Sequence, residues 1–143
     1  MDLKDFIIRL LVAMLSGILI GLERQIHHKS AGMRTNALVA MGSAIFVMIS
    51  FQITAEKGGD STRIIGQIVT GIGFLGAGVI LHQGMNIQGL TTAATIWCSS
   101  GIGCLAATGY FAEVAVAVVA VIFVNVFVRL LDDWIRKPES HET

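Results

Sequence analysis

The chain has 143 residues, of which 54% are hydrophobic and 14% charged, and its 10 lysines and arginines balance its 10 aspartates and glutamates. An average globular protein has about 25% charged residues, and a small domain has too much surface for its volume to bury this much apolar material. The high hydrophobic and low charged fractions exclude an ordinary water-soluble domain and indicate a protein embedded in a lipid bilayer. Without an excess of basic residues, the sequence also gives no reason to expect nucleic-acid binding.

Five apolar stretches of 17 to 22 residues follow one another along the chain. Such lengths suit helices that cross a hydrocarbon core about 30 Å thick, and the backbone in lipid must be helical because open sheet edges cannot stay unpaired there. We expect a single membrane domain over residues 1–135 and a short cytoplasmic tail over 136–143. The sequence predicts an all-α fold, a polytopic bundle of five transmembrane helices at about 6–22, 36–55, 64–81, 90–108 and 110–131.

The distribution of lysine and arginine predicts the orientation. Four of them lie on the side of the N-terminus and the 56–63 loop, and six lie on the side of the 23–35 loop and the C-terminal tail. The positive-inside rule therefore predicts an N-terminus outside and a C-terminus in the cytoplasm. Because GLERQ rather than a small-residue cleavage site follows the first stretch, we expect a retained helix and not a signal peptide.

Residues 71–78 read GIGFLGAG and satisfy the dinucleotide-binding pattern G-x-G-x-x-G. That pattern indicates a nucleotide site only after a strand and with an acidic residue about 20 residues downstream. Here it lies inside the third apolar stretch, and the next acidic residue is Glu113. We therefore expect no nucleotide or other cofactor and interpret the glycines as helix-packing residues.

The third helix carries one continuous face of small side chains, because Gly66, Thr70, Gly73 and Ala77 recur at i, i+4, i+7 and i+11. Small residues let helix backbones approach closely in a membrane. We expect this helix at the centre of the bundle, packed against a hydroxyl-bearing face of the fourth helix. The complete packing set is Gly66, Thr70, Gly71, Gly73, Gly76, Ala77 and Gly78.

The conspicuous polar residues stand at helix ends, in segments 21–25, 31–38 and 82–95, which the predicted topology brings to one side. One interpretation is structural: threonine or asparagine caps the helices, and Glu23 pairs with Arg34. The other is functional: two helix N-termini beside Arg24 and Arg34 form a site for an anion, a lipid phosphate or an acidic partner segment. The residues expected to converge are Glu23, Arg24, Arg34, Thr35, Asn36, Asn86, Thr91 and Thr92.

The spacing of potential ligands does not indicate a metal site. His27 and His28 are adjacent and should diverge, so we interpret the histidines as solvated loop residues. Glu56, Asp60 and Glu113 could gather loosely on the outer side, where carboxylates attract hydrated Mg²⁺. Because basic residues lie beside them, we interpret these carboxylates as a surface rather than a metal cage.

Three long stretches resemble the MgtC/SapB family of bacterial inner-membrane proteins. They are GLERQ with AGMRTNALVAMGSAIFV, then QIVTGIGFLGAGVIL, then MNIQGLTTAATIWCSSGIGCLA, and they cover roughly residues 10–110 in the family's order. The resemblance implies a polytopic domain of five helices in the inner membrane. Its better-known members are induced at low Mg²⁺ and support growth under magnesium starvation and survival in host cells. They also carry a cytoplasmic C-terminal domain that this sequence lacks, so we expect a short form.

The resemblance implies a modulating role towards other membrane proteins, including ATP synthase. We expect a non-enzymatic multi-pass protein, without catalytic or metal-binding residues, that contacts lipid and other membrane proteins and forms a homodimer. The central apolar stretches contain no acidic residue, whereas ion carriers normally place such residues inside the span. The alternative is a small transporter or channel for an ion, with a path lined by Gln67, Thr95 and Ser99 and gated by Arg34 or Glu23.

Overall fold

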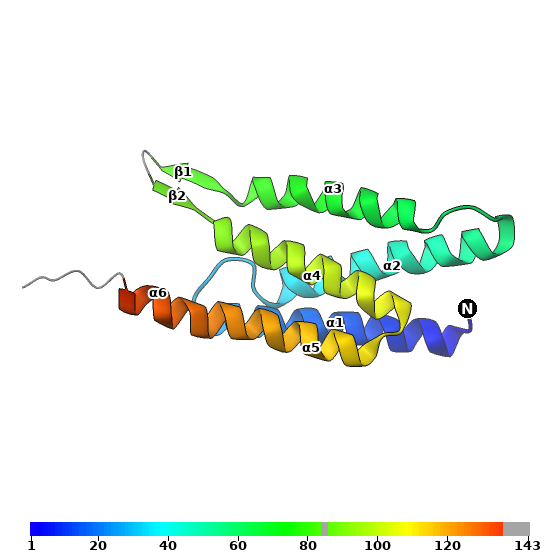
Figure 1. The fold of residues 1–143 in the computed structure, drawn as a ribbon, viewed down its shortest axis with the longest axis horizontal. Coiled ribbons are helices and arrows are strands. Elements are labelled where there is room, and N and C mark those ends of the chain that lie inside the picture. Colours follow the sequence, from blue (N-terminus) through cyan, green and yellow to red (C-terminus); the bar gives the residue numbers. More distant parts are fainter. Residues whose placement is uncertain (84–85, 136–143) are drawn as a thin grey trace, which may run out of the picture.

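The computed structural model describes residues 1–83 and 86–135 and forms a bundle of long helices (Figure 1). Two short strands pair as an antiparallel hairpin, with His82 opposite Ile87 in the register. The last three helical elements follow one another as a single rod. In chain order the elements are α1 (Leu3–Ile26), α2 (Met33–Lys57), α3 (Thr62–Gly78), β1 (Leu81–Gln83), β2 (Asn86–Gln88), α4 (Leu90–Thr108), α5 (Phe111–Phe123), η1 (Val124–Val128) and α6 (Arg129–Ile135).

The prediction of an all-α fold with five long helices is confirmed for the described residues, apart from the hairpin. Helix α4 has the predicted bounds, and α1 and α2 extend beyond theirs at both ends. Among the described residues, the prediction of transmembrane helices is confirmed for four, which are long and apolar enough to cross a membrane: Leu3–Ile26, Met33–Lys57, Leu90–Thr108 and Phe111–Leu131. Helix α3, with 17 residues, is not one of them. The predicted third stretch, 64–81, extends too far, because α3 ends at Gly78 and β1 begins at Leu81.

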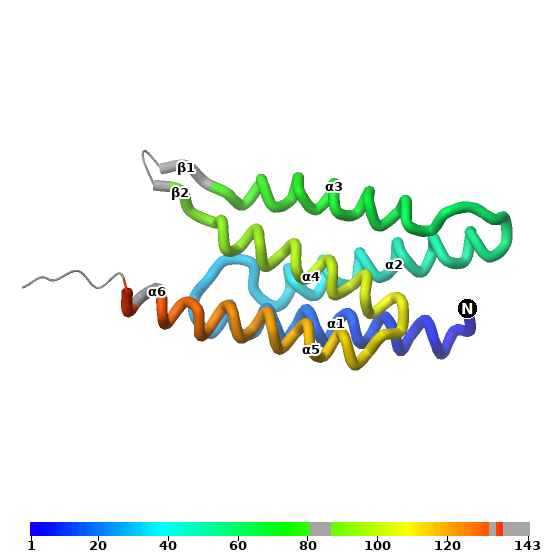
Figure 2. Tube along the Cα trace, in the orientation of Figure 1, coloured from blue at the N-terminus to red at the C-terminus, as the bar shows by residue number. Residues whose placement is uncertain are grey.

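The connections divide between the two ends of the bundle (Figure 2). One end carries the N-terminus, the α2–α3 connection and the α4–α5 turn. The other carries the α1–α2 connection, the β1–β2 hairpin and α6, and is referred to below as the hairpin end. The prediction that segments 21–25, 31–38 and 82–95 share one end is therefore confirmed for their described residues, while the predicted tail at 136–143 lies outside those residues.

Helix α4, and not α3, lies at the centre of the bundle. It packs against α1, α2, α3 and α5, whereas α3 packs mainly against α4 at one edge. Within α3 only Ile72 and Gly76 are buried. The prediction of a central third helix is wrong, because a face of small residues permits close approach without fixing which neighbour fills it.

Close backbone contacts through glycine do occur, but on α1 and α4. A Cβ added at Gly17 or Gly21 would overlap the backbone of the first turns of α2, and one added at Gly103 would overlap the backbone of Ala40. These glycines let α1 and α4 press against α2 with no side chain between them. By contrast, a Cβ added at Gly66, Gly71, Gly73 or Gly78 of α3 meets nothing within 4 Å.

Small side chains fill the core between these three helices. Ala13 and Ile20 of α1, Ala40 and Ala44 of α2, and Ala106 of α4 each have no exposed surface. Two buried serines join α2 to α4, since Ser43 Oγ lies 2.7 Å from Ser100 Oγ. A short hydrogen bond of this kind satisfies hydroxyl groups that would otherwise be costly to bury.

At the end of the bundle opposite the hairpin, Arg9 of α1 contacts the last turn of α4. Its Nη2 lies 3.0 Å from Asp5 Oδ2, and its Nη1 donates to the carbonyl of Ala107 in the last turn of α4. A cation here satisfies a carbonyl that the helix leaves free and complements the negative end of the helix dipole. Arg9, a charge near the start of an apolar stretch, thus links α1 to the end of α4.

The α2–α3 connection orders its carboxylates locally. Asp60 Oδ1 accepts hydrogen bonds from the hydroxyl of Thr62 at 2.6 Å and from its backbone N–H at 2.8 Å. The Thr62 hydroxyl and then the N–H favour the charged carboxylate and lower the pKa of Asp60. Glu56 is contacted from its own helix by Gln52, so these carboxylates have separate local partners.

The close approach of α4 to α2 predicts that the same substitution destabilises the fold at one glycine of α4 and not at another. Gly103→Ala should destabilise the fold by about 1–3 kcal/mol, the cost of overpacking, because the Ala40 backbone cannot rotate away from the new methyl group. Gly101→Ala is the matched control, since its Cβ meets nothing within 4 Å. Thermal unfolding of both purified variants in detergent, followed by circular dichroism, measures the difference, and equal midpoints would contradict the close contact.

Candidate functional site

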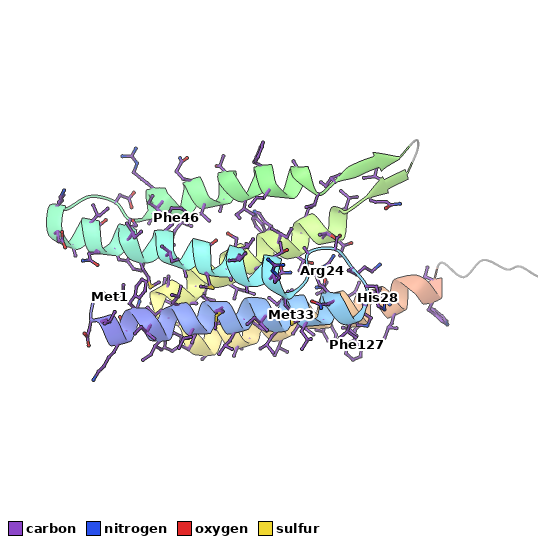
Figure 3. The ribbon with its side chains drawn as sticks, turned by 180° about the vertical axis from the view of Figure 1, so that it is seen from behind. Met1, Arg24, His28, Met33, Phe46 and Phe127 are labelled. Atoms are coloured by element: carbon purple, nitrogen blue, oxygen red, sulfur yellow. The ribbon has the colours of Figure 1, made fainter. Side chains whose placement is uncertain are left out.

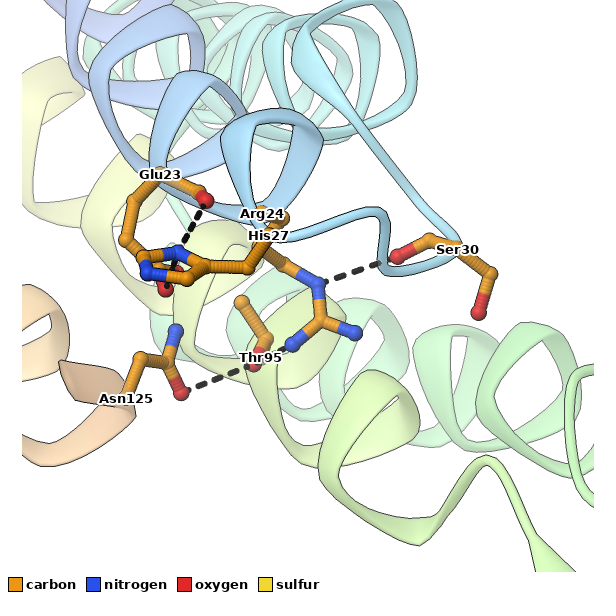
Figure 4. Close-up of polar contacts among 6 residues, drawn as sticks. All are labelled: Glu23, Arg24, His27, Ser30, Thr95 and Asn125. Atoms are coloured by element: carbon orange, nitrogen blue, oxygen red, sulfur yellow. Dashed lines mark hydrogen bonds and ion pairs between the residues drawn. The ribbon is translucent and has the colours of Figure 1, made fainter. Parts of the chain in front are cut away.

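A buried arginine connects three segments at the hairpin end. Arg24, in the last turn of α1, is 3% exposed. Its Nε donates to the carbonyl of Ser30 at 3.0 Å and its Nη1 to Thr95 Oγ1 at 3.3 Å (Figure 4). Its Nη2 donates to Thr92 Oγ1 at 2.5 Å. Arg24 therefore ties the α1–α2 connection to the beginning of α4 (Figure 3).

Helical spacing explains why a charged residue faces the interior here. Ala13, Gly17, Ile20 and Arg24 recur at i, i+4, i+7 and i+11, and all four are buried on one face of α1. A buried charge is costly unless it is well hydrogen-bonded. All three hydrogen-bond acceptors of the Arg24 guanidinium are neutral hydroxyl or carbonyl oxygens, and the carboxylate of the adjacent Glu23 is the nearby opposite charge.

Glu23, the neighbour of Arg24 in sequence, pairs with His27. The carboxylate Oε1 lies 3.0 Å from His27 Nδ1, and the Glu23 side chain is 9% exposed. Its second oxygen, Oε2, is buried and has no hydrogen-bond partner among the described residues. The predicted pair of Glu23 with Arg34 is wrong, because His27 lies one turn further along the same helix whereas Arg34 points outward from α2 and is exposed.

Asn36 forms a second buried contact between helices. It has no exposed surface, its Oδ1 accepts from Ser99 Oγ at 2.8 Å, and its Nδ2 donates to the carbonyl of Gly32 at 3.0 Å. It therefore holds the beginning of α2 against α4. A helix cap would instead accept from the free N–H groups of the first turn, so the predicted capping role of Asn36 is wrong.

Helix α4 also begins without the predicted threonine cap. Its N-cap is Gly89, with a φ of 92°, and no side chain caps the first turn. A Cβ at position 89 would overlap the backbone of Val79, so glycine suits both the left-handed φ and the close approach. Thr92 points instead to Arg24, and its hydroxyl lies 3.2 Å from Ser30 Oγ.

The structure brings together only part of the predicted cluster. Glu23, Arg24 and Thr92 lie at one site, and Asn36 is buried nearby against Ser99. Three other predicted residues, Arg34, Thr35 and Thr91, are exposed, although Thr91 lines the cavity described below. The side chain of the eighth, Asn86, lies outside the described part of the structure.

Ser30, His27 and Asn125 were missing from the predicted cluster. His27 is the C-cap of α1 and pairs with Glu23, so its assignment as a solvated loop residue is wrong. Asn125 is the single strongly polar residue in an apolar run, which was a detectable signal, but its direction depends on the π-helical segment η1. Such segments occur frequently at functional sites, and this one places Asn125 Oδ1 3.4 Å from Thr95 Oγ1.

A cavity of about 1010 Å³ lies beside these residues, between the end of α1, the β2–α4 connection and the η1–α6 rod. The first turn of α4 lines it together with Asn125, whose Nδ2 has no hydrogen-bond partner in the described structure. Basic side chains outnumber acidic ones among the described residues of its lining. These residues are Arg24, Lys29 and Arg129 with His27 and His28, against Glu23.

The hydrogen bond from Arg24 to Thr92 predicts that substitutions at Thr92 and at the adjacent Thr91 affect the stability of the fold differently. Thr92→Val should destabilise the fold by about 1–3 kcal/mol, because it leaves a donor of the buried Arg24 guanidinium without an acceptor. Thr91→Val is the control, since the Thr91 side chain is exposed and only its carbonyl accepts a hydrogen bond, from Thr95. Denaturation of the two variants in detergent compares them, and an equal loss in both would show that Arg24 does not depend on the hydroxyl of Thr92.

These features define a class of protein. Long apolar helices alternate in direction around a core of small residues, and the buried ionisable groups gather at helix ends. This is a polytopic helical membrane protein. A family model for the MgtC family matches residues 10–134, and the chain belongs to that family.

Several named relatives extend over most of the chain. "Protein MgtC" of Salmonella typhimurium strain LT2 is 51% identical over 124 residues, covering 87% of this chain and 52% of the relative. "Protein MgtC" of Brucella abortus strain 2308 is 52% identical over 119 residues, covering 83% and 49% respectively. An uncharacterized protein of Synechocystis is 42% identical over 143 residues, covering 100% and 60%. The chain thus spans about half the length of these relatives, and no solved structure matches it.

Proposed function

We propose that this protein is a non-enzymatic component of the bacterial inner membrane that modulates other membrane proteins through direct contact between helices. The magnesium-starvation setting implied by the family resemblance suggests a role in magnesium homeostasis or in adaptation to stress. The proposed orientation places the N-terminus outside and the hairpin end in the cytoplasm. It rests on the excess of lysine and arginine in the segments at the hairpin end.

The observation that carries the proposal is the unoccupied small-residue face of α3. Gly66, Thr70, Gly73 and Ala77 are exposed, and added Cβ atoms at the two glycines meet nothing within 4 Å. The Thr70 hydroxyl donates to the carbonyl of Gly66 at 3.0 Å, so the face has no unsatisfied hydroxyl. It is a shallow strip of backbone on the outermost helix of the bundle.

Such a strip is suited to a helix rather than to lipid chains. Helix association in a bilayer depends on close van der Waals packing between rigid surfaces, and small residues on one face give the largest contact between backbones. Phe74, 84% exposed, lies beside the strip and would pack against an incoming helix. The same surface on a second copy would give a symmetric homodimer, and a foreign helix would give a mixed complex.

The alternative of an ion transporter or channel is less consistent with the buried polar residues. Thr95 and Ser99, proposed to line a path, donate to the Thr91 carbonyl and to Asn36 Oδ1. Gln67 is exposed on the outer helix α3, away from both. Selective flux of Mg²⁺, H⁺ or an anion through the purified protein in liposomes would contradict the proposed function.

The proposal predicts that a bulky residue on the strip spares the fold and removes association. Gly73→Leu should leave the melting temperature unchanged, because nothing lies within 4 Å of its Cβ. It should lower by about tenfold the yield of crosslinked homodimer from a photo-reactive amino acid placed at position 74, since a loss of about 1.4 kcal/mol in contact energy weakens binding tenfold. The yield is measured in native membranes by gel electrophoresis of the irradiated protein.

Gly101→Leu is the matched control, because Gly101 is also an exposed helical glycine with open space around it but lies on α4. It should leave the crosslinking yield at the wild-type level. Equal yields from wild type and Gly73→Leu would refute the α3 strip as the contact surface. Loss of the folded protein in Gly73→Leu would instead show that α3 is packed within the chain.

A further inference from the structure

We propose that the cavity at the hairpin end binds a headgroup that carries both a phosphate and an ammonium group. The cavity is large enough for such a headgroup, at about 1010 Å³. The described part of its wall presents two unlike features, the Arg24 guanidinium and a carboxylate oxygen of Glu23 that has no hydrogen-bond partner there. The described lining of this site includes no residue of α3, so the proposal can be tested independently of the proposed helix contacts.

The phosphate half of the site rests on Arg24 and the beginning of α4. The three hydrogen bonds of the Arg24 guanidinium go to neutral acceptors and do not use all its N–H donors. The N-terminus of the 19-residue helix α4 lines the same cavity, and no side chain caps it. Free N–H groups at a helix N-terminus and a guanidinium are both preferred partners of phosphate oxygens, and Lys29 adds a further positive charge at the rim.

The ammonium half rests on Glu23. Its side chain is 9% exposed, one carboxylate oxygen contacts His27, and the other is buried and has no hydrogen-bond partner among residues 1–83 and 86–135 as the structure describes them. A ligand with a phosphate alone would bring a second anion towards this carboxylate and leave Oε2 without a hydrogen bond, which is unfavourable for a buried polar atom. An ammonium group on the same ligand satisfies Oε2 and neutralises the carboxylate.

Asn125 supplies the remaining contact. Its Nδ2 is buried and has no hydrogen-bond partner in the described part of the chain, while its Oδ1 faces Thr95. Asn125 lines the cavity from η1, next to Thr95 (Figure 4). Its N–H groups suit an oxygen of the phosphate, as the Arg24 guanidinium does, and it is the carboxylate of Glu23 that favours a zwitterion over a simple anion.

The apolar part of the wall favours a membrane lipid as the source of the headgroup. Val124, Val128 and Leu131 line the cavity from the η1–α6 rod. The outer faces of α1 and this rod continue the apolar surface, with Leu19, Leu22 and Phe127 exposed. An ethanolamine phospholipid would place its headgroup in the cavity and its chains along this surface, whereas a soluble phosphorylated amine would use the polar wall alone.

The test is a titration of the purified full chain, stripped of lipid in detergent, followed by native mass spectrometry. The probes are dioleoyl phosphatidylethanolamine, dioleoyl phosphatidylglycerol, phosphoethanolamine and inorganic phosphate. Wild type should bind the ethanolamine lipid about tenfold more tightly than the glycerol lipid, because only the first has an ammonium group for Glu23. Glu23→Gln preserves the shape of the side chain and should remove this preference by weakening the ethanolamine lipid alone.

Two further variants keep the test decisive. Lys29→Gln alters an exposed side chain at the rim and should weaken both lipids by about threefold, even if Glu23→Gln does not fold. Arg34→Gln is the control, because Arg34 is an exposed basic residue at the same end that does not line the cavity, and it should change neither affinity. Circular dichroism checks that each variant is folded.

The titrations distinguish a membrane lipid from a soluble phosphorylated amine as the source of the headgroup. Binding of the ethanolamine lipid without phosphoethanolamine identifies a lipid headgroup, and comparable binding of both identifies the shared zwitterionic chemistry. Equal affinity of wild type for the two lipids, or binding of inorganic phosphate as tight as that of phosphoethanolamine, would overturn the ammonium contact. Absence of binding by every probe would overturn the site.

Discussion

The close approach of α1 and α4 to α2 is the constraint on which the rest of the structure depends. At Gly17, Gly21 and Gly103 the neighbouring backbone occupies the space that any side chain would need. In lipid there is no hydrophobic force to hold apolar helices together, so this contact replaces it. The same approach brings the end of α1 within hydrogen-bonding distance of α4, where Arg24 reaches Thr92 and Thr95.

The polar cluster and the cavity follow from that contact. With α1, α2 and α4 fixed, the buried hydroxyl and amide groups pair between helices, as Ser99 does with Asn36. The η1–α6 rod stands further off at the hairpin end, and the space between it and α4 is the cavity. Two buried polar atoms have no hydrogen-bond partner among the described residues, Glu23 Oε2 and Asn125 Nδ2, and both belong to residues that line this space.

Helix α3 has a different relation to the bundle. It contributes little to the core, and apart from the buried Gly76 its glycines have open space around them. The protein therefore has two surfaces of unlike chemistry, an apolar strip suited to a helix and a charged cavity suited to a polar headgroup. Their separation means that a substitution on one should leave the other unaffected, so the two proposed activities can be studied independently.

The amino-acid sequence by itself determined the class of protein, the number of long helices and the end of the bundle where the polar residues gather, because hydropathy and length are local properties of the chain. It also indicated that small residues would carry the packing. Only the tertiary structure decided that Gly103 rather than Gly73 makes the close contact, that Glu23 pairs with His27 rather than Arg34, and that Asn125 faces the cavity. Which residues of two packed helices come into contact depends on how each helix is rotated about its own axis. The periodicity of one helix carries no information about the face that the neighbouring helix presents to it.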